Sequence, residues 1–190
     1  MKGKILITCF EPFGGEAKNS SMAVAAAFPK EIAGYEAVKL TLPVEFCRAA
    51  ETAEAKARDI GAKYIISFGQ AGARSNVTPE LLAINLAHAS IPDNSGAKPQ
   101  DEPIEAGGSA AYFTGFPARV LAEQIKKQGV ASALSYSAGT YVCNDLYYRL
   151  LSAFEKEDVT VIFIHVPRES AELSAEKMAI ALANAIETLL

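Results

Sequence analysis

Short uninterrupted apolar runs alternate with longer helical stretches along this 190-residue chain. The runs lack polar alternation and are bounded by turn residues, which is typical of strands in a parallel sheet covered on both faces. The clear runs are 4–8, 37–42, 64–68 and 159–164, and a weaker one is 131–135. We predict a strand at each of them, and a hairpin strand within 81–87 in the otherwise irregular middle of the chain.

The stretches between these runs carry apolar residues at helical spacing. Pro43 predicts the start of one helix, which ends before Gly61, and Ser174 predicts the N-cap of the last helix. The expected helices are 20–28, 43–60, 109–128, 144–156 and 174–189. This order predicts an α/β fold with an open, mostly parallel sheet and helices on both faces. With no linker or internal repeat, residues 1–190 are expected to form a single domain.

Charge and cysteine usage exclude several classes of protein. Eighteen Lys and Arg against 22 Asp and Glu give a net charge of −4 without the basic stripe that nucleic-acid binding needs. No segment approaches the ~20 apolar residues of a membrane span, and the run 5–10 is shorter than the apolar core of a secretion signal. Three cysteines do not make a disulfide framework. We therefore expect a cytoplasmic protein with reduced thiols and no membrane or nucleic-acid partner.

Two residues combine reactive chemistry with a position at the carboxyl edge of the predicted sheet, where ligands bind in such folds. His165 directly follows the run 159–164, whereas His88, the other histidine, has no comparable position. Cys143 opens a predicted helix, whose N-terminal N–H groups can lower a thiol pKa and bind an oxyanion. We predict a lowered pKa and a nucleophilic role for Cys143. Cys47 is expected to be a buried packing residue, and nothing beside Cys9 would activate its thiol.

A cysteine–histidine pair needs a third group that orients the imidazole. Glu80 and Glu11 both lie at the same predicted edge, and the pattern alone leaves the choice between them open. The glycine-rich segments match neither a dinucleotide-binding nor a P-loop motif, and zinc-ligand spacings are missing. We expect no metal and no cofactor.

Three blocks resemble the pyroglutamyl peptidase type I family, also called pyrrolidone-carboxylate peptidases. They are Cys9-Phe10-Glu11-Pro12-Phe13-Gly14-Gly15 with Asn19; Gly69-Gln70-Ala71-Gly72 through Glu80 to Ile91-Pro92-Asp93-Asn94; and Ser137 to Asn144 followed by Phe163-Ile164-His165-Val166-Pro167. They occur in the order and spacing of the family across nearly the whole chain.

The resemblance implies a three-layer α/β/α sandwich and a catalytic triad of Cys143, His165 and Glu80. The implied activity is that of a cysteine omega-peptidase, which removes an N-terminal 5-oxoproline from peptides through a thioester acyl-enzyme. It also implies a homo-oligomer, a tetramer or a dimer. The 5-oxoproline ring would occupy an apolar pocket with a few polar contacts. The residues expected to form that pocket are Phe10, Phe13, Asn19, Gln70, Ile91, Tyr141 and Val142.

The chain departs from the family pattern at Ser90, where the family usually has an arginine that helps to hold the oxyanion. Losing one oxyanion donor costs about 10²–10³ in rate unless another group replaces it. Two alternatives to a pyroglutamyl peptidase follow. One is a cysteine amidase or lactam hydrolase of the same fold, and the other is an inactive 5-oxoproline-binding homologue.

Overall fold

The computed structural model describes residues 1–190 and contains the four parallel strands expected from the clear apolar runs. The six-stranded sheet has the order β2-β3-β1-β4-β8-β5, and only the short strands at its two ends are antiparallel to their neighbours. Its strands are β1 (Gly3–Phe10), β2 (Glu31–Ile32), β3 (Tyr35–Leu42), β4 (Ala62–Gln70), β5 (Thr78–Pro79) and β8 (Thr160–Val166). The expected α/β architecture with a mostly parallel sheet is confirmed.

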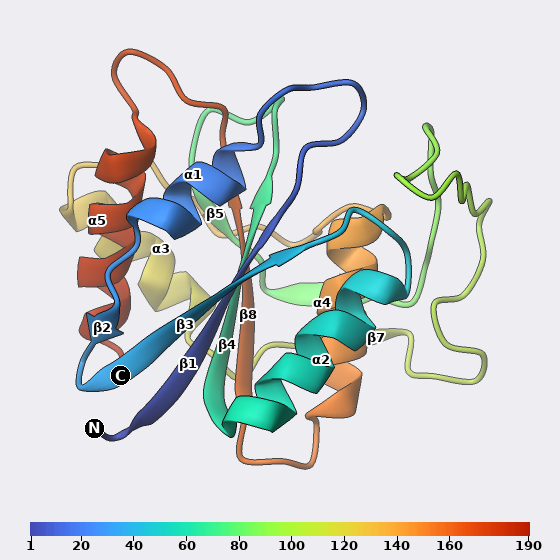
Figure 1. Ribbon diagram of the computed structural model, residues 1–190, viewed down its shortest axis with the longest axis horizontal. Helices are drawn as coiled ribbons and strands as arrows, with labels where there is room; N and C mark the ends of the chain where they lie inside the picture. Colours follow the sequence, from blue (N-terminus) through green and yellow to red (C-terminus); the bar gives the residue numbers. More distant parts are fainter.

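Five helices cover the two faces of the sheet (Figure 1). On one face lie α1 (Ser20–Ala27), α3 (Ala118–Lys127) and α5 (Ala175–Glu187), and on the other lie α2 (Arg48–Ile60) and α4 (Val142–Ala153). Each face buries its own apolar cluster, so the domain is a three-layer α/β/α sandwich with two cores. None of these helices combines the length and the hydropathy that crossing a membrane requires.

Two helices begin later than the sequence predicts. The helix expected from Pro43 begins at Arg48, because Cys47 has φ +62° and the helix cannot continue through that conformation. The helix expected from residue 109 begins at Ala118, since β7 (Ala111–Phe113) pairs with β6 (Leu82–Ile84) instead. That pairing confirms a strand within 81–87, although residues 85–110 separate it from its antiparallel partner, so the two strands do not form a tight hairpin.

The other three helices are confirmed, with small shifts at their ends. Ser174 caps α5 as expected, and its side chain accepts a hydrogen bond from the Lys177 N–H at 3.3 Å. The helix α4 begins at Val142, so Cys143 lies within its first turn.

The weaker run 131–135 does not form a regular strand. It pairs with the β5 segment only through two isolated bridges, Val77 with Ser132 and Glu80 with Ser135. Pro79 lies between the two bridges and has no N–H to donate, which interrupts the ladder. The prediction of a strand here is therefore wrong in detail, although the segment does lie along the edge of the sheet.

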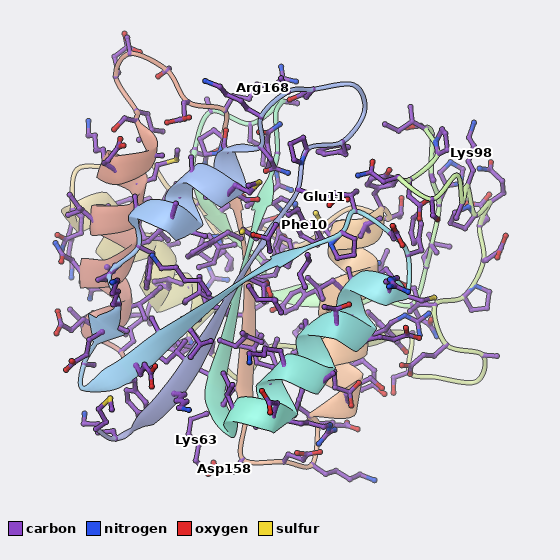
Figure 2. The ribbon with its side chains drawn as sticks, in the orientation of Figure 1. Phe10, Glu11, Lys63, Lys98, Asp158 and Arg168 are labelled. Carbon is purple, nitrogen blue, oxygen red and sulfur yellow. The ribbon has the colours of Figure 1, made fainter.

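The carboxyl ends of β1, β4 and β8 meet at one edge of the sheet. Figure 2 shows Phe10, Glu11 and Arg168 toward this edge, and Lys63 and Asp158, paired at 2.7 Å, at the opposite one. The chain segments that leave β1, β4 and β8 therefore converge around a common space.

Candidate active site

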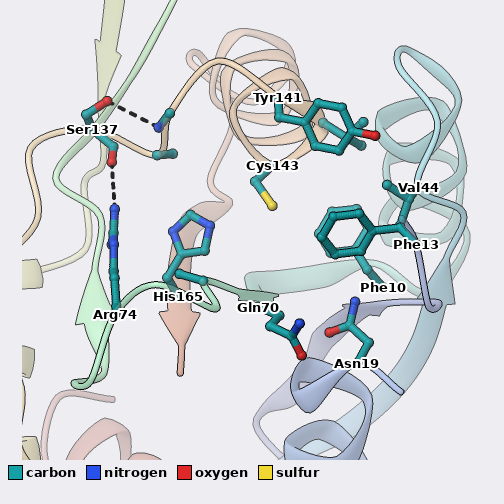
Figure 3. Close-up of a pocket in the computed structure, with 14 residues that line it drawn as sticks. Phe10, Phe13, Asn19, Val44, Gln70, Arg74, Ser137, Tyr141, Cys143 and His165 are labelled. Atoms are coloured by element: carbon teal, nitrogen blue, oxygen red, sulfur yellow. Dashed lines mark hydrogen bonds between the residues drawn. The ribbon is translucent and has the colours of Figure 1, made fainter. Parts of the chain in front are cut away.

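A cavity of about 470 Å³ opens at the carboxyl edge of the sheet (Figure 3). It collects residues from β1, α1, β4, β8, α4 and the loops beside them. Its lining consists of Phe10, Phe13, Asn19, Val44, Gln70, Ala71, Arg74, Ser137, Ala138, Gly139, Tyr141, Val142, Cys143 and His165. Most of the residues predicted from the sequence to form the site are thus brought together here.

His165 and Glu80 form a buried pair beside this cavity. His165 lies on β8 and is 5% exposed, while Glu80, just after β5, is fully buried. The Nδ1 atom of His165 lies 2.7 Å from Oε1 of Glu80. An ionised carboxylate only accepts hydrogen bonds, so Nδ1 carries the proton and Nε2 is free to act as a base. Glu11, the alternative acid, instead accepts a hydrogen bond from Asn94.

Cys143 lies in the first turn of α4 and is partly buried. Figure 3 shows its sulfur directed into the cavity that the His165 ring also lines. The N–H groups of Asn144 and Asp145 bond to the Tyr141 carbonyl, whereas those of Val142 and Cys143 have no acceptor within the chain. The helix therefore presents two free donors beside the thiol.

The pKa of Cys143 is raised, whereas the sequence predicts a lowered value. Burial and the Glu80 carboxylate raise the pKa of the Cys143 thiol to about 12 and outweigh the helix N-terminus. Burial also lowers the pKa of His165, against the opposing effect of Glu80. A protonated thiol therefore faces a neutral imidazole at neutral pH, and reaction requires transfer of the thiol proton to His165.

The side of the cavity away from His165 is apolar. The ring centroids of Phe13 and Tyr141 lie 6.0 Å apart, and the Phe46 ring packs edge-on against Tyr141 with a centroid distance of 5.4 Å. Phe10, at the end of β1, and Val44, which the sequence analysis missed, complete this wall (Figure 3). The arrangement suits a small uncharged ring.

The two amides predicted to bind substrate are already engaged in structural hydrogen bonds. The Asn19 oxygen accepts from the Ser21 N–H and hydroxyl as the N-cap of α1, and its amide donates to the Glu11 carbonyl. The Gln70 oxygen accepts from the Ser20 N–H at 2.7 Å, and its amide donates to Glu16. Each amide thus keeps one N–H available; the Asn19 oxygen already accepts two bonds, whereas the Gln70 oxygen accepts one and can accept another.

Several predicted residues lie outside the cavity. Ile91 is 44% exposed and faces Gly14 rather than the cavity, and Ser90 is exposed nearby. Cys47 is exposed, which corrects the expectation of a buried residue, because it precedes α2 and contacts Arg149. Cys9 is buried beside Thr41, away from the cavity lining, and burial raises its pKa. His88 lies 3.0 Å from Asp101 at the surface.

Arg74 is the functional candidate that the sequence analysis missed. It lies in the loop after β4, lines the cavity, and donates to Glu80 Oε1 at 2.6 Å. The only sequence signal was its place at the sheet edge, which does not distinguish it among 18 Lys and Arg. The structure contains no group of three or more His, Cys, Asp or Glu arranged to hold a metal ion.

Comparison with known proteins gives one consistent family. A family model described as pyroglutamyl peptidase matches residues 3–188. The pyrrolidone-carboxylate peptidase of Levilactobacillus brevis is 43% identical over 166 residues, covering 86% of this chain and 81% of that protein. The corresponding Staphylococcus carnosus protein is 41% identical, over 86% of this chain and 78% of its own length.

Solved structures agree with these matches. The crystal structure of pyroglutamyl peptidase I from Bacillus amyloliquefaciens covers 100% of this chain and 96% of its own, with TM-score 0.92 and 37% identity. The pyrrolidone carboxyl peptidase of Thermococcus litoralis covers 98% of this chain and 93% of its own, with TM-score 0.91 and 32% identity.

Proposed function

The chain belongs to the pyroglutamyl peptidase family and is a cysteine hydrolase of the pyroglutamyl-peptidase I type, and we propose that Cys143, His165 and Glu80 carry out its reaction. The Cys143 sulfur attacks the carbonyl carbon of an N-terminal 5-oxoproline residue while His165 Nε2 takes the thiol proton. His165 then protonates the departing amine, which leaves a thioester on Cys143. Water, activated by His165, hydrolyses the thioester and releases 5-oxoproline.

The hydrogen bond between His165 and Glu80 is the observation that carries this assignment. A distance of 2.7 Å between buried partners fixes the imidazole with Nε2 toward the cavity, where Figure 3 shows the Cys143 sulfur. The lowered pKa of His165 keeps the base neutral at the pH where the thiol must be deprotonated.

The oxyanion of the tetrahedral intermediate is assigned to the first turn of α4. The free N–H groups of Val142 and Cys143 lie beside the nucleophile, and the helix dipole favours negative charge there. Backbone donors of this kind do not depend on the residue at position 90. Ser90 is therefore compatible with turnover, and the comparisons support neither the drifted amidase nor the inactive binder.

The 5-oxoproline ring is assigned to the apolar wall of the cavity. Phe10, Phe13, Tyr141 and Val142, which line the cavity, pack against the ring, whereas Ile91 lies outside the cavity and is not assigned to the ring. Because the Asn19 oxygen is committed to the α1 cap, this amide can only donate, and we assign its free N–H to the lactam carbonyl.

Gln70 is assigned a second donor role at the ring, through the amide N–H that is not bonded to Glu16. Proline lacks the lactam carbonyl and would leave these donors unpaired, so the site should reject it.

The remaining assignments concern the setting of the enzyme. Three free cysteines support a reducing compartment, and we assign the protein to the cytoplasm. The substrates are peptides with N-terminal pyroglutamate, the reaction as written uses no metal or cofactor, and the assembly is a homo-oligomer, a tetramer or a dimer.

Hydrolysis of pyroglutamyl-naphthylamide by purified protein tests the triad. We expect turnover by the wild type, loss of at least about 10³-fold in Cys143→Ser, and unchanged turnover in Cys47→Ser, which removes an exposed thiol outside the cavity. Prolyl-naphthylamide should not be cleaved. Equal turnover by wild type and Cys143→Ser would refute Cys143 as the nucleophile, and absence of wild-type turnover would refute the assigned substrate.

A further inference from the structure

The guanidinium of Arg74 connects the acid of the triad to the loop that leads to the nucleophile. Its Nη1 donates to Oε1 of Glu80 at 2.6 Å and also bonds the Thr78 hydroxyl, while Nη2 donates to the Ser137 carbonyl at 3.1 Å. We propose that Arg74 is a positioning residue of the reaction, which orients Glu80 and fixes its distance from the 137–142 loop. This inference rests on the proposed function.

The hydrogen bonding of Glu80 shows why a second partner is needed. Its carboxylate is fully buried, and both His165 and Arg74 bind the same oxygen, Oε1. The other oxygen, Oε2, has no hydrogen-bond partner at all. Without Arg74 the side chain of Glu80 would be held by His165 alone, and a buried carboxylate with one partner is poorly oriented and poorly stabilised.

The second arm of the guanidinium reaches the nucleophile loop. Ser137 begins the segment that runs through Gly139 and Tyr141 into the first turn of α4, where Cys143 and the two free N–H groups lie. Because the guanidinium is planar and rigid, its contacts to Glu80 and Ser137 fix the separation of these two parts of the site. A lysine ammonium would keep the charge but could not hold both partners in that geometry.

The charge of Arg74 acts on the base as well. The titratable groups that face His165 are Glu80 from beyond β5, Arg74 from the loop after β4, and Cys143 from α4. Glu80 favours protonation of the imidazole, and Arg74 opposes it. Arg74 therefore helps to keep His165 in the neutral form that accepts the thiol proton.

The experiment compares Arg74→Ala and Arg74→Lys with Arg119→Ala, a control that removes an exposed arginine bonded to Tyr136. We expect Arg74→Ala to lower kcat for pyroglutamyl-naphthylamide about 10²-fold, with KM within about threefold, because misplacement of catalytic groups costs rates of this order. The kcat of Arg74→Lys should lie between that of Arg74→Ala and that of the wild type. Added guanidinium ion should restore part of the Arg74→Ala activity, since Arg74 is partly open to the cavity.

The pH dependence separates positioning from a purely structural role. In Arg74→Ala the acid limb of the pH profile of kcat/KM should move to higher pH, because the positive charge that opposes protonation of His165 is gone. Added guanidinium ion should move this limb back to lower pH. A rate loss without a shifted limb and without rescue would overturn the proposal, as would unchanged kcat.

The rate at which iodoacetamide alkylates the Cys143 peptide, followed by mass spectrometry, gives the same pH profile without any substrate. The profile should shift in Arg74→Ala even if the wild type cleaves no pyroglutamyl amide, so failure of the proposed function is distinguishable. An unshifted alkylation profile would overturn the role of Arg74 on its own.

Discussion

Gly69 illustrates at the scale of one residue how tightly the site is packed. A Cβ atom added there would lie 2.6 Å from the Phe163 ring and 3.1 Å from the Cys143 sulfur. Phe163 is itself fully buried, so the ring has little room to yield. Gly69 is therefore required mainly by the close approach of the Phe163 ring to β4, and also by that of the Cys143 sulfur, not by a special backbone angle.

Gly69→Ala should lower kcat/KM for pyroglutamyl-naphthylamide by at least about tenfold, because the added methyl displaces Cys143 or the Phe163 ring beside it. Overpacking of this kind should also cost about 1–3 kcal/mol of unfolding free energy. Steady-state kinetics and urea unfolding measure the two effects. In the matched control, Gly115→Ala, the new methyl meets nothing within 4 Å, and both quantities should stay at wild-type values. Equal behaviour of the two variants would contradict this account.

A candidate residue can be proposed from the sequence where position alone is sufficient. His165 and Cys143 each follow or open a recognisable element at the carboxyl edge, and both line the cavity. Arg74 could not be identified, since its importance comes from two contacts made across the fold. The predicted lowering of the Cys143 pKa is wrong, because the helix N-terminus can be recognised in the sequence and the burial of the sulfur cannot.

At the scale of elements, Asn144 joins the nucleophile helix to the β6 strand. It is fully buried; its oxygen accepts from the Ile84 N–H at 3.0 Å, and its amide donates to the carbonyls of Ile84 and Leu86. These bonds hold α4 against β6 and do not involve the side chain of the neighbouring Cys143.

Asn144→Ala should reduce the unfolding free energy by about 1–3 kcal/mol, because the Ile84 N–H and the Leu86 carbonyl lose their partner and the Ile84 carbonyl loses one of two. Urea denaturation gives the value. Asn184→Ala, which removes an exposed asparagine bonded to Gln128, should stay within about 0.5 kcal/mol of the wild type. If Asn144→Ala were equally neutral, these bonds would not be what holds α4 in place.

Elements with long apolar runs were predictable and their ends were not. The four clear runs became the parallel strands, because a strand buried on both faces leaves a strong pattern. The late start of α2 depends on hydrogen bonds from Phe46 and Cys47 to the distant Asp93 and Asp145. Such long-range partners leave no local signal.

At the scale of the whole molecule, the buried neutral His165 ties stability to pH. Its pKa is lower in the folded protein than in the unfolded chain, where it is about 6.5. Below pH ~6.5 the unfolded state binds more protons than the folded state. The contribution of His165 to stability is therefore fully present above pH ~6.5 and is lost as the pH falls below that value.

Urea unfolding between pH 5 and pH 7 should therefore show a decrease in unfolding free energy on acidification that is smaller in His165→Gln. Identical slopes for the wild type and His165→Gln would show that protonation of His165 is not linked to unfolding.

The overall architecture was predictable from the alternation of elements, whereas the assignment of each helix to one face of the sheet was not. Which helix covers which face depends on the strand order β2-β3-β1-β4-β8-β5, and the sequence does not state that order. The approximate position of the cavity could be predicted from the sequence, because ligands bind at the carboxyl edge of an open parallel sheet.

The strand order has a consequence for how the protein is made. β8 is the last strand along the chain, yet it lies inside the sheet, where Ile162 pairs with Ile66 of β4. Until the ribosome has delivered β8, β4 presents an unpaired apolar edge of the kind that recruits chaperones and favours aggregation. The same strand carries His165, so a nascent chain that still lacks it holds Cys143 without the imidazole that we propose as its base. The sheet and the proposed catalytic pair are thus completed in the same late step of synthesis.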